Sequence, residues 1–192
     1  MIISELPIYL ASKSPRRRKL LAQLGIKFKS FSVDLHEEVF DGEHPIQTVK
    51  RLALHKLEEA KKIRSNGIFI TADTIVVLDK EIIGKPKSKS DAERILKKLS
   101  GRTHSVYTGF ALFNSIKNKT LVDYEKTSVT FRKLSRNEIK EYIAGGSPMD
   151  KAGAYGIQDD FGAVFVSEIK GCYYNVVGLP LSKLYSDLQR II

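Results

Sequence analysis

The chain has 192 residues, of which 42% are hydrophobic and 28% charged, so it is long enough for one sizeable core or two small lobes and too apolar for a disordered protein. No run approaches the roughly 18 to 20 continuous apolar residues that a membrane span requires, and a lone cysteine, Cys172, excludes an internal disulfide. These features predict a cytoplasmic protein without a signal peptide or a membrane contact. The net charge of +10 favours an anionic partner, although a solvated basic surface on the helices explains most of the excess.

The first predicted elements are a short buried strand at residues 8–11 and a helix that follows it. Ser14 precedes Pro15, and leucines then recur at helical spacing as far as Gly25, which predicts a helix capped by Ser14 and ended by the glycine.

The loop into this helix carries a candidate oxyanion cradle. It combines the hydroxyls of Ser12 and Ser14, two guanidiniums, Arg16 and Arg17, and the positive end of the helix dipole, which together suit a phosphate group. The alternative is an ordinary helix cap with a solvated basic first turn. Basic residues near a helix N-terminus oppose its dipole, and that placement is easier to understand if an anion binds there.

The next predicted elements are a strand at 28–33, an acidic loop, a helix that opens at Pro45, and a second apolar strand at 68–73. Residues 75–78 continue as strand, residues 79–80 make a turn, and residues 81–83 complete a hairpin with polar residues at its mouth.

Asp73 stands where the apolar run 68–73 ends. Burial without a partner would be expensive there, so its carboxylate must be hydrogen-bonded, ion-paired, metal-bound or exposed in a cleft. The alternative is a turn aspartate that caps local N–H groups. Lys85, between Gly84 and Pro86, lies in a rigid turn that suits close approach to a ligand, the alternative being a plain surface turn.

The second half of the chain predicts a helix capped by Ser90, strands at 105–114 and 121–134, and a helix that begins at Ser135 with Glu138 at the capping-box position. A glycine-rich stretch at 152–158, a strand at 163–169 and a final helix at 181–192 follow. The predicted class is α/β with a mixed sheet and flanking helices. The four histidines have no metal-like spacing, and each is interpreted as a structural or surface residue.

Six segments occur in an order that carries a family resemblance. They are Leu10-Ala11-Ser12-x-Ser14-Pro15-Arg16-Arg17, Ala72-Asp73-Thr74, Gly84-Lys85-Pro86, Ser100-Gly101-Arg102-Thr103-His104, Asp150-Lys151-Ala152-Gly153-Ala154-Tyr155-Gly156-Ile157-Gln158 and Val177-Gly178-Leu179-Pro180. Together they resemble the Maf family of nucleoside triphosphate pyrophosphatases, also called septum-formation inhibitors. The resemblance spans essentially the whole chain.

The resemblance implies one domain over residues 1–192 with an inosine-triphosphatase-like (Maf/Ham1 type) fold, in which two lobes surround a central cleft. It also implies a nucleoside triphosphate diphosphatase, a hydrolase that cleaves between the α and β phosphates and removes unwanted or modified nucleotides. By the same resemblance Asp73 matches the proton acceptor, and Lys56 and Lys85 match basic residues of the active site. The combination of Arg16, Thr74 and Gln158 resembles the subfamily that hydrolyses dTTP and UTP.

A divalent cation is the implied cofactor. Mg²⁺, or Mn²⁺, suits carboxylate and phosphate oxygens, and no thiol or histidine cluster invites a softer metal. The resemblance implies an acidic metal ligand soon after the second strand, for which we choose Glu37, with Asp34 and Glu38 as alternatives in a neighbouring register. Whether Asp73 takes the proton or mainly binds the metal is left open.

Two other functions remain open at this point. A pI of about 9.6 and the basic run at 16–19 are also compatible with a non-enzymatic nucleic-acid-binding protein. A pyrophosphatase for purine or modified nucleotides is the alternative within the hydrolases. The preferred interpretation has a small-molecule nucleoside triphosphate as partner, no membrane and no specific nucleic acid, and it leaves room for a homodimer.

Overall fold

The computed structural model describes residues 4–35, 39–40, 42–158 and 161–192, and it divides into two compact units. The first unit comprises Met1–Asp73, Thr108–Glu125 and Gly178–Ile192, and the second comprises Thr74–Tyr107 and Lys126–Val177. Within the described ranges no helix is both long and apolar enough to cross a membrane. The single domain and the central cleft expected from the sequence stay predictions.

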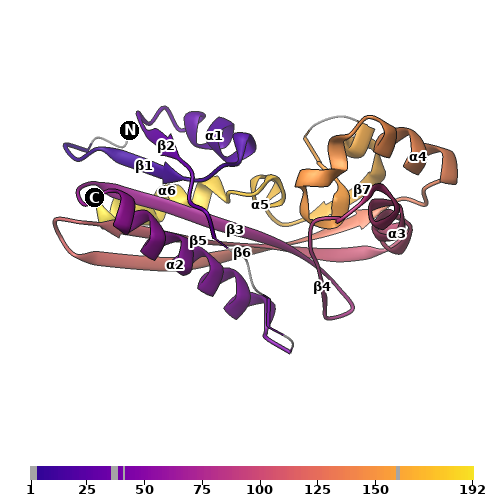
Figure 1. The fold of residues 1–192 in the computed structure, drawn as a ribbon, viewed down its shortest axis with the longest axis horizontal. Coiled ribbons are helices and arrows are strands. Elements are labelled where there is room, and N and C mark those ends of the chain that lie inside the picture. The colour runs from indigo at the N-terminus through magenta and orange to yellow at the C-terminus, as the bar shows by residue number, and fades with distance from the viewer. Residues whose placement is uncertain (1–3, 36–38, 41, 159–160) are drawn as a thin grey trace. The chain divides into compact units, whose positions relative to one another are not determined.

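The strands form one mixed sheet in the order β2-β1-β3-β5-β6-β7, with β4 paired to β3 (Figure 1). Their bounds are β1 Ile8–Ala11, β2 Lys29–Phe31, β3 Ile68–Leu78, β4 Glu81–Ile83, β5 Thr103–Asn114, β6 Lys119–Phe131 and β7 Val166–Lys170. Strand β1 runs parallel to β2 and β3, whereas the pairs β3–β4 and β6–β7 are antiparallel. The predicted mixed α/β class is therefore confirmed.

The helices are α1 Pro15–Ala22, α2 Pro45–Ile63, α3 Lys89–Leu99, α4 Arg136–Ala144, α5 Tyr173–Val177 and α6 Leu181–Ile191. Short 3-10 helices lie at Ser147–Asp150, Ala152–Ala154 and Phe161–Phe165. Proline at the first position of α1 and of α2 fits a helix start, because the N–H that it lacks would have no partner within the helix.

In the first unit, the buried face of α2 packs closely against the sheet. The Thr71 hydroxyl in β3 donates to the carbonyl oxygen of Ala53 at 2.7 Å. A Cβ atom at Gly109 in β5 would lie 2.3 Å from the carbonyl oxygen of Val49, so only glycine allows this approach. The core beside this contact consists of Ala11, Ala53, Leu57, Ala60, Phe69, Ala111 and Phe113.

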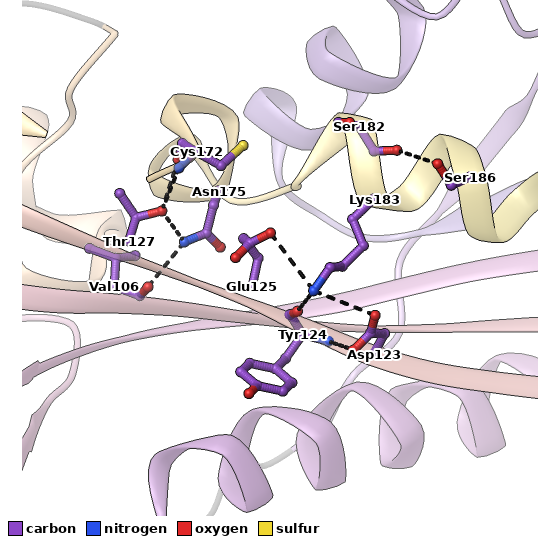
Figure 2. Close-up of polar contacts among 10 residues, drawn as sticks. All are labelled: Val106, Asp123, Tyr124, Glu125, Thr127, Cys172, Asn175, Ser182, Lys183 and Ser186. Atoms are coloured by element: carbon purple, nitrogen blue, oxygen red, sulfur yellow. Dashed lines mark hydrogen bonds and ion pairs between the residues drawn. The ribbon is translucent and has the colours of Figure 1, made fainter. Parts of the chain in front are cut away.

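Helix α6 is fixed to β6 of the same unit by Lys183. Its ammonium donates to the carbonyl oxygen of Tyr124 at 2.8 Å and lies 3.6 Å and 3.8 Å from the carboxylates of Asp123 and Glu125 (Figure 2). At the C-terminal end of the same helix, the side-chain amide of Asn114 donates to the carbonyl oxygen of Ile191 at 2.9 Å. This lysine thus contributes a structural contact as well as positive charge.

In the second unit, two capped helices, α3 and α4, pack against each other. The N-cap of α3 is Ser88, whose hydroxyl accepts from the Asp91 N–H at 3.1 Å, so the predicted cap at Ser90 is wrong by two residues. The capping box of α4 is confirmed, because Ser135 and Glu138 each accept the other's backbone N–H. Hydrogen bonds from Arg132 and Ser135 lower the pKa of Glu138 to about 2.

Helix α5, which the sequence did not indicate, is held by buried polar side chains of the second unit (Figure 2). The Asn175 amide donates to the carbonyl oxygen of Val106 at 3.0 Å and to the Thr127 hydroxyl at 2.9 Å. That hydroxyl donates to the carbonyl oxygen of Cys172 and accepts its N–H, at 3.0 Å and 3.1 Å. Strand β7 starts at Val166, three residues later than predicted, because 161–165 form a 3-10 helix.

Candidate active site

The start of α1 has the geometry of a capped helix. The Ser14 hydroxyl accepts from the Arg17 N–H at 3.3 Å, and the Ser12 hydroxyl accepts from the Ser14 N–H at 3.2 Å. The cap predicted at Ser14 is confirmed. Since both serine oxygens act as acceptors here, each hydroxyl still has a hydrogen to donate to an oxyanion.

Arg17 is oriented by a segment that lies far away in the sequence. Its Nε donates to the carbonyl oxygen of Gly178 at 2.8 Å, which joins the basic helix start to the turn at 177–180, another of the six segments. Arg16 is half-buried on the same helix. The structure thus places Ser12, Ser14, Arg16 and Arg17 around one helix start, as the sequence indicated.

Asp73 lies in the interior of β3, which continues without a break to Leu78, so its predicted position at a strand end is wrong. Its carboxylate forms an ion pair with the ammonium of Lys56 on α2. Lys56 lies three residues after Ala53 on the helix, and Asp73 two residues after Thr71 on the strand. Side chains return to the same face every three to four residues in a helix and every two in a strand. Lys56 therefore faces Asp73 in the same way as Ala53 faces Thr71.

The Lys56–Asp73 pair is almost wholly buried, with 9% and 5% of each residue exposed. Taking two charges out of water costs several kcal/mol for each ion, roughly, and a well-packed apolar pair of similar volume is often as stable or more stable. Stability alone is therefore a weak reason for this pair. A paired, buried carboxylate is the kind of group that reaction centres use.

The remaining site candidates belong to the second unit. Thr74 and Gln158 are half-buried, whereas Lys85 is exposed. The Gly153 N–H donates to the carbonyl oxygen of Gly84 at 3.1 Å, so the backbone next to Lys85 is tied to the glycine-rich segment that ends in Gln158. Two of the six sequence segments are thus connected within this unit.

The backbone of the glycine-rich segment is unusual at two positions. Gly153 has φ of 74°, and Ala154, which is fully buried, has φ of 59°. For a residue with a Cβ atom the left-handed conformation costs about 1–2 kcal/mol. Such strain persists where surrounding contacts enforce it, and ligand-binding segments are a common place for it.

His104 and Tyr155 form a buried polar contact within an aromatic cluster. The histidine Nε2 and the tyrosine hydroxyl are 2.8 Å apart, and both rings pack edge-on against Phe131. Burial lowers the pKa of His104 to about 4 and raises that of Tyr155, so both are neutral at pH 7. His104 is thus buried rather than a surface residue, and its link to the segment that carries Gln158 was missed by the sequence interpretation.

The structure describes only part of the acidic loop in which the sequence places a metal ligand. Glu37, the chosen ligand, and Glu38 lie outside the described residues. Asp34 is exposed and ion-paired with Lys13, while Glu43 receives two hydrogen bonds from Arg51, at 2.8 Å and 2.6 Å, which lower its pKa. Among the residues described, no group of three histidine, cysteine, aspartate or glutamate side chains could hold a metal.

The fold is of the HAM1 type. A solved structure of a HAM1 protein from Coxiella burnetii is similar over 96% of this chain and 99% of that chain, with a TM-score of 0.56 and 16% sequence identity. At this identity the likeness concerns the fold alone.

Sequence comparison is more specific: a model of the Maf-like protein family matches residues 7–191, and the chain belongs to this family. A relative from Dictyoglomus thermophilum, named dTTP/UTP pyrophosphatase, is 49% identical over 186 residues, which cover 96% of this chain and 95% of the relative. A relative of the same name from Syntrophomonas wolfei is 47% identical over 181 residues, covering 94% and 95% of the two chains.

Proposed function

We propose that this protein hydrolyses dTTP and UTP to the nucleoside monophosphate and pyrophosphate. The observation that carries the proposal is the buried Lys56–Asp73 pair in a chain whose relatives, at 47% and 49% identity over nearly their full length, are named dTTP/UTP pyrophosphatases. We also place the enzyme in the cytoplasm, where a single cysteine stays reduced. A homodimer stays a prediction.

In the proposed reaction, a water oxygen attacks the α-phosphorus and the bond from that phosphorus to the bridging oxygen breaks, which releases pyrophosphate. Asp73 orients the water and accepts its proton, while Lys56 holds the carboxylate in place. Cationic groups at the start of α1 neutralise charge that develops on the phosphate oxygens. The hydroxyls of Ser12 and Ser14 add neutral donors at the same helix start.

A divalent cation fits the described residues only if the substrate supplies part of its coordination. Asp73 offers a buried carboxylate, and Mg²⁺ is commonly held by one or two carboxylates together with substrate phosphates and water. Asp73 would hold the cation together with the acidic ligand that the family resemblance implies, which is Glu37 or one of its alternatives, Asp34 and Glu38. When bound, the cation would polarise the phosphate oxygens.

Base selection is assigned to Gln158, Arg16 and Thr74. A glutamine amide both donates and accepts, so it can make two hydrogen bonds to the edge of uracil or thymine, where a ring N–H lies beside two carbonyl oxygens. The same amide can rotate to meet adenine, so Gln158 cannot select alone. The donors of Arg16 and Thr74 suit carbonyl-rich bases, so part of the selection is assigned to them.

The assignment of Asp73 is tested by Asp73→Asn, which keeps the shape of the side chain but removes its basicity. We expect turnover to be abolished while circular dichroism and melting behaviour stay those of a folded protein. The matched control is Asp79→Asn in the turn before β4, where the carboxylate is exposed and paired with Arg102. Turnover of Asp73→Asn within a few-fold of the wild type would overturn the assignment.

The substrate is tested by measuring kcat/KM for dTTP, UTP, ATP and GTP with detection of pyrophosphate, in the wild type and in Gln158→Ala. We expect dTTP and UTP to be preferred over ATP and GTP in the wild type, because each polar group left unpaired costs about 1–3 kcal/mol. In Gln158→Ala the difference in kcat/KM between these two groups of nucleotides should become smaller. A wild type that prefers purines would point to the other pyrophosphatase function. A protein that releases no pyrophosphate from any nucleotide would favour the nucleic-acid-binding alternative.

A further inference from the structure

The segment 152–158 is held by contacts from other parts of the second unit. The Gly153 N–H donates to the carbonyl oxygen of Gly84 at 3.1 Å, and the Gly156 N–H donates to the Tyr142 hydroxyl at 3.1 Å. The third contact is the 2.8 Å hydrogen bond between the Tyr155 hydroxyl and His104. These contacts fix three of the residues that lead to Gln158.

The conformation of this segment needs such contacts. Gly153 and Ala154 both have positive φ values, 74° and 59°, and the alanine is a residue type that seldom adopts them. A Cβ atom at Gly153 would lie 2.9 Å from Val76 and 3.3 Å from the Tyr155 ring, so the turn is also tightly packed. A strained segment of this kind keeps one conformation only while its surroundings enforce it.

The contact between His104 and Tyr155 stabilises the protein only weakly, because burying the pair leaves a hydrogen-bonding atom without a partner in the part of the chain that the structure describes. Neutral histidine and tyrosine carry one N–H and one O–H hydrogen between them, and they share a single hydrogen bond. The other ring nitrogen of His104, Nδ1, is buried and has no hydrogen-bond partner among the described residues. Since two apolar side chains of the same shape would avoid this deficit, stability alone does not explain the pair.

We propose that His104 is a positioning residue for base recognition, which acts by holding Tyr155 and thereby the segment that presents Gln158. The inference rests on the proposed function, because it deepens the role given there to Gln158. A hydrogen bond is directional, whereas apolar packing is not. The histidine on β5 can therefore fix the orientation of the tyrosine ring, and packing alone would only keep the ring buried. The bond thus selects one orientation of the segment.

The test uses Tyr155→Phe, which deletes the hydroxyl and keeps the ring that packs on Phe131. We expect KM for dTTP to rise and the ratio of kcat/KM for dTTP to that for ATP to fall about tenfold, since small displacements of a binding group are costly. Hydrolysis at saturating dTTP should change much less. Tyr185→Phe on α6 is the matched control, because its hydroxyl accepts from the Gln189 side chain of the same helix, at 3.4 Å, and lies outside the segment 152–158.

A double-mutant cycle separates positioning from a merely structural role. In a Gln158→Ala background, Tyr155→Phe should leave the dTTP to ATP ratio unchanged, because the group that it positions is already gone. His104→Leu should repeat the effect of Tyr155→Phe, and His104→Gln should restore much of the ratio, since its amide can bond to the tyrosine hydroxyl. If Tyr155→Phe does not fold, the two histidine variants carry the test.

Two results would overturn the inference. One is an unchanged dTTP to ATP ratio in folded Tyr155→Phe or His104→Leu while Gln158→Ala lowers it. The other is a further, additive fall in the double variant, which would mean that the pair acts on something other than Gln158. An unchanged ratio in Gln158→Ala alone would refute base recognition by that residue, and the inference with it, whereas hydrolysis of dTTP and UTP by the wild type would still stand.

Discussion

His104 should make the protein less stable in mild acid. Burial lowers the pKa of its imidazole from the ordinary 6.5 to about 4. Above pH 6.5 the native and the unfolded chain both leave this group neutral, so the full stability is present there. Below pH 6.5 the unfolded chain takes up a proton that the native protein does not bind until the pH falls to about 4.

The magnitude follows from these two pKa values. The difference between 6.5 and about 4 is worth about 3 kcal/mol in total, and about 2 kcal/mol of this is lost between pH 7 and pH 5. Acidic groups contribute in a lower range: the pKa of Glu138 falls from 4.5 to about 2, so the stability linked to it is lost below about pH 4.5. The interval from pH 7 to pH 5 therefore isolates His104 from this carboxylate.

The assay is urea unfolding at pH 7 and at pH 5, followed by circular dichroism, in the wild type, His104→Leu and His104→Gln. Neither replacement titrates, so the loss of free energy of unfolding between the two pH values should be about 2 kcal/mol smaller in both variants than in the wild type. Comparing the same protein at two pH values removes the constant effect of each substitution on packing. An equal loss in all three proteins would refute the reasoning.

Four further substitutions test the predicted triphosphate contacts, the helix cap of α1 and the packing of α2. Arg16→Ala and Lys85→Ala should raise KM and lower kcat together, since contacts to the triphosphate strengthen in the transition state. Steady-state kinetics at low salt check this. Wild-type kinetics in both variants would mean that the start of α1 is an ordinary helix cap and not a phosphate site. Ser14→Ala should lower the free energy of unfolding by about 1 kcal/mol through the lost cap, measured by urea unfolding. Gly109→Ala should cost about 3 kcal/mol or more, because its Cβ would lie 2.3 Å from the Val49 carbonyl oxygen; an unchanged melting temperature would contradict the close packing of α2.

Local signals in the sequence were sufficient for most of the elements. The start of α1 could be predicted because Ser14 and Pro15 act on their own neighbours, and the capping box at Ser135 is equally local. The cap of α3 was misplaced because Ser88 and Ser90 are both suitable residues. Only the structure shows that the Asp91 N–H bonds to Ser88.

Contacts between distant residues account for what the sequence could not predict. Asp73 was interpreted as a strand end because a charge inside an apolar run is costly, but Lys56, 17 residues earlier, provides the compensating partner. Helix α5 has only five residues and depends on Thr127, which lies 45 residues before Cys172. Such pairings leave no periodic pattern along the chain.

The candidate site shows the same division. The cradle around α1 is a run of adjacent residues and could be proposed from the sequence itself, whereas Lys56, Thr74 and Gln158 were named only through the family resemblance. Nothing in the residues around His104 indicated that it bonds to Tyr155, because the two are 51 residues apart.

Thr71 and Asp73 lie on the same face of β3, and this limits where residues can be deleted from the chain. Substitutions alter one side chain at a time, but deletion of a single residue between 68 and 72 would turn Asp73 away from α2, since successive strand residues point to opposite faces. The turn at Asp79 and Lys80 is different, because both residues are exposed and already adopt positive φ values of 50° and 70°. Natural variation in length should therefore accumulate at this turn and be absent from the strand before it.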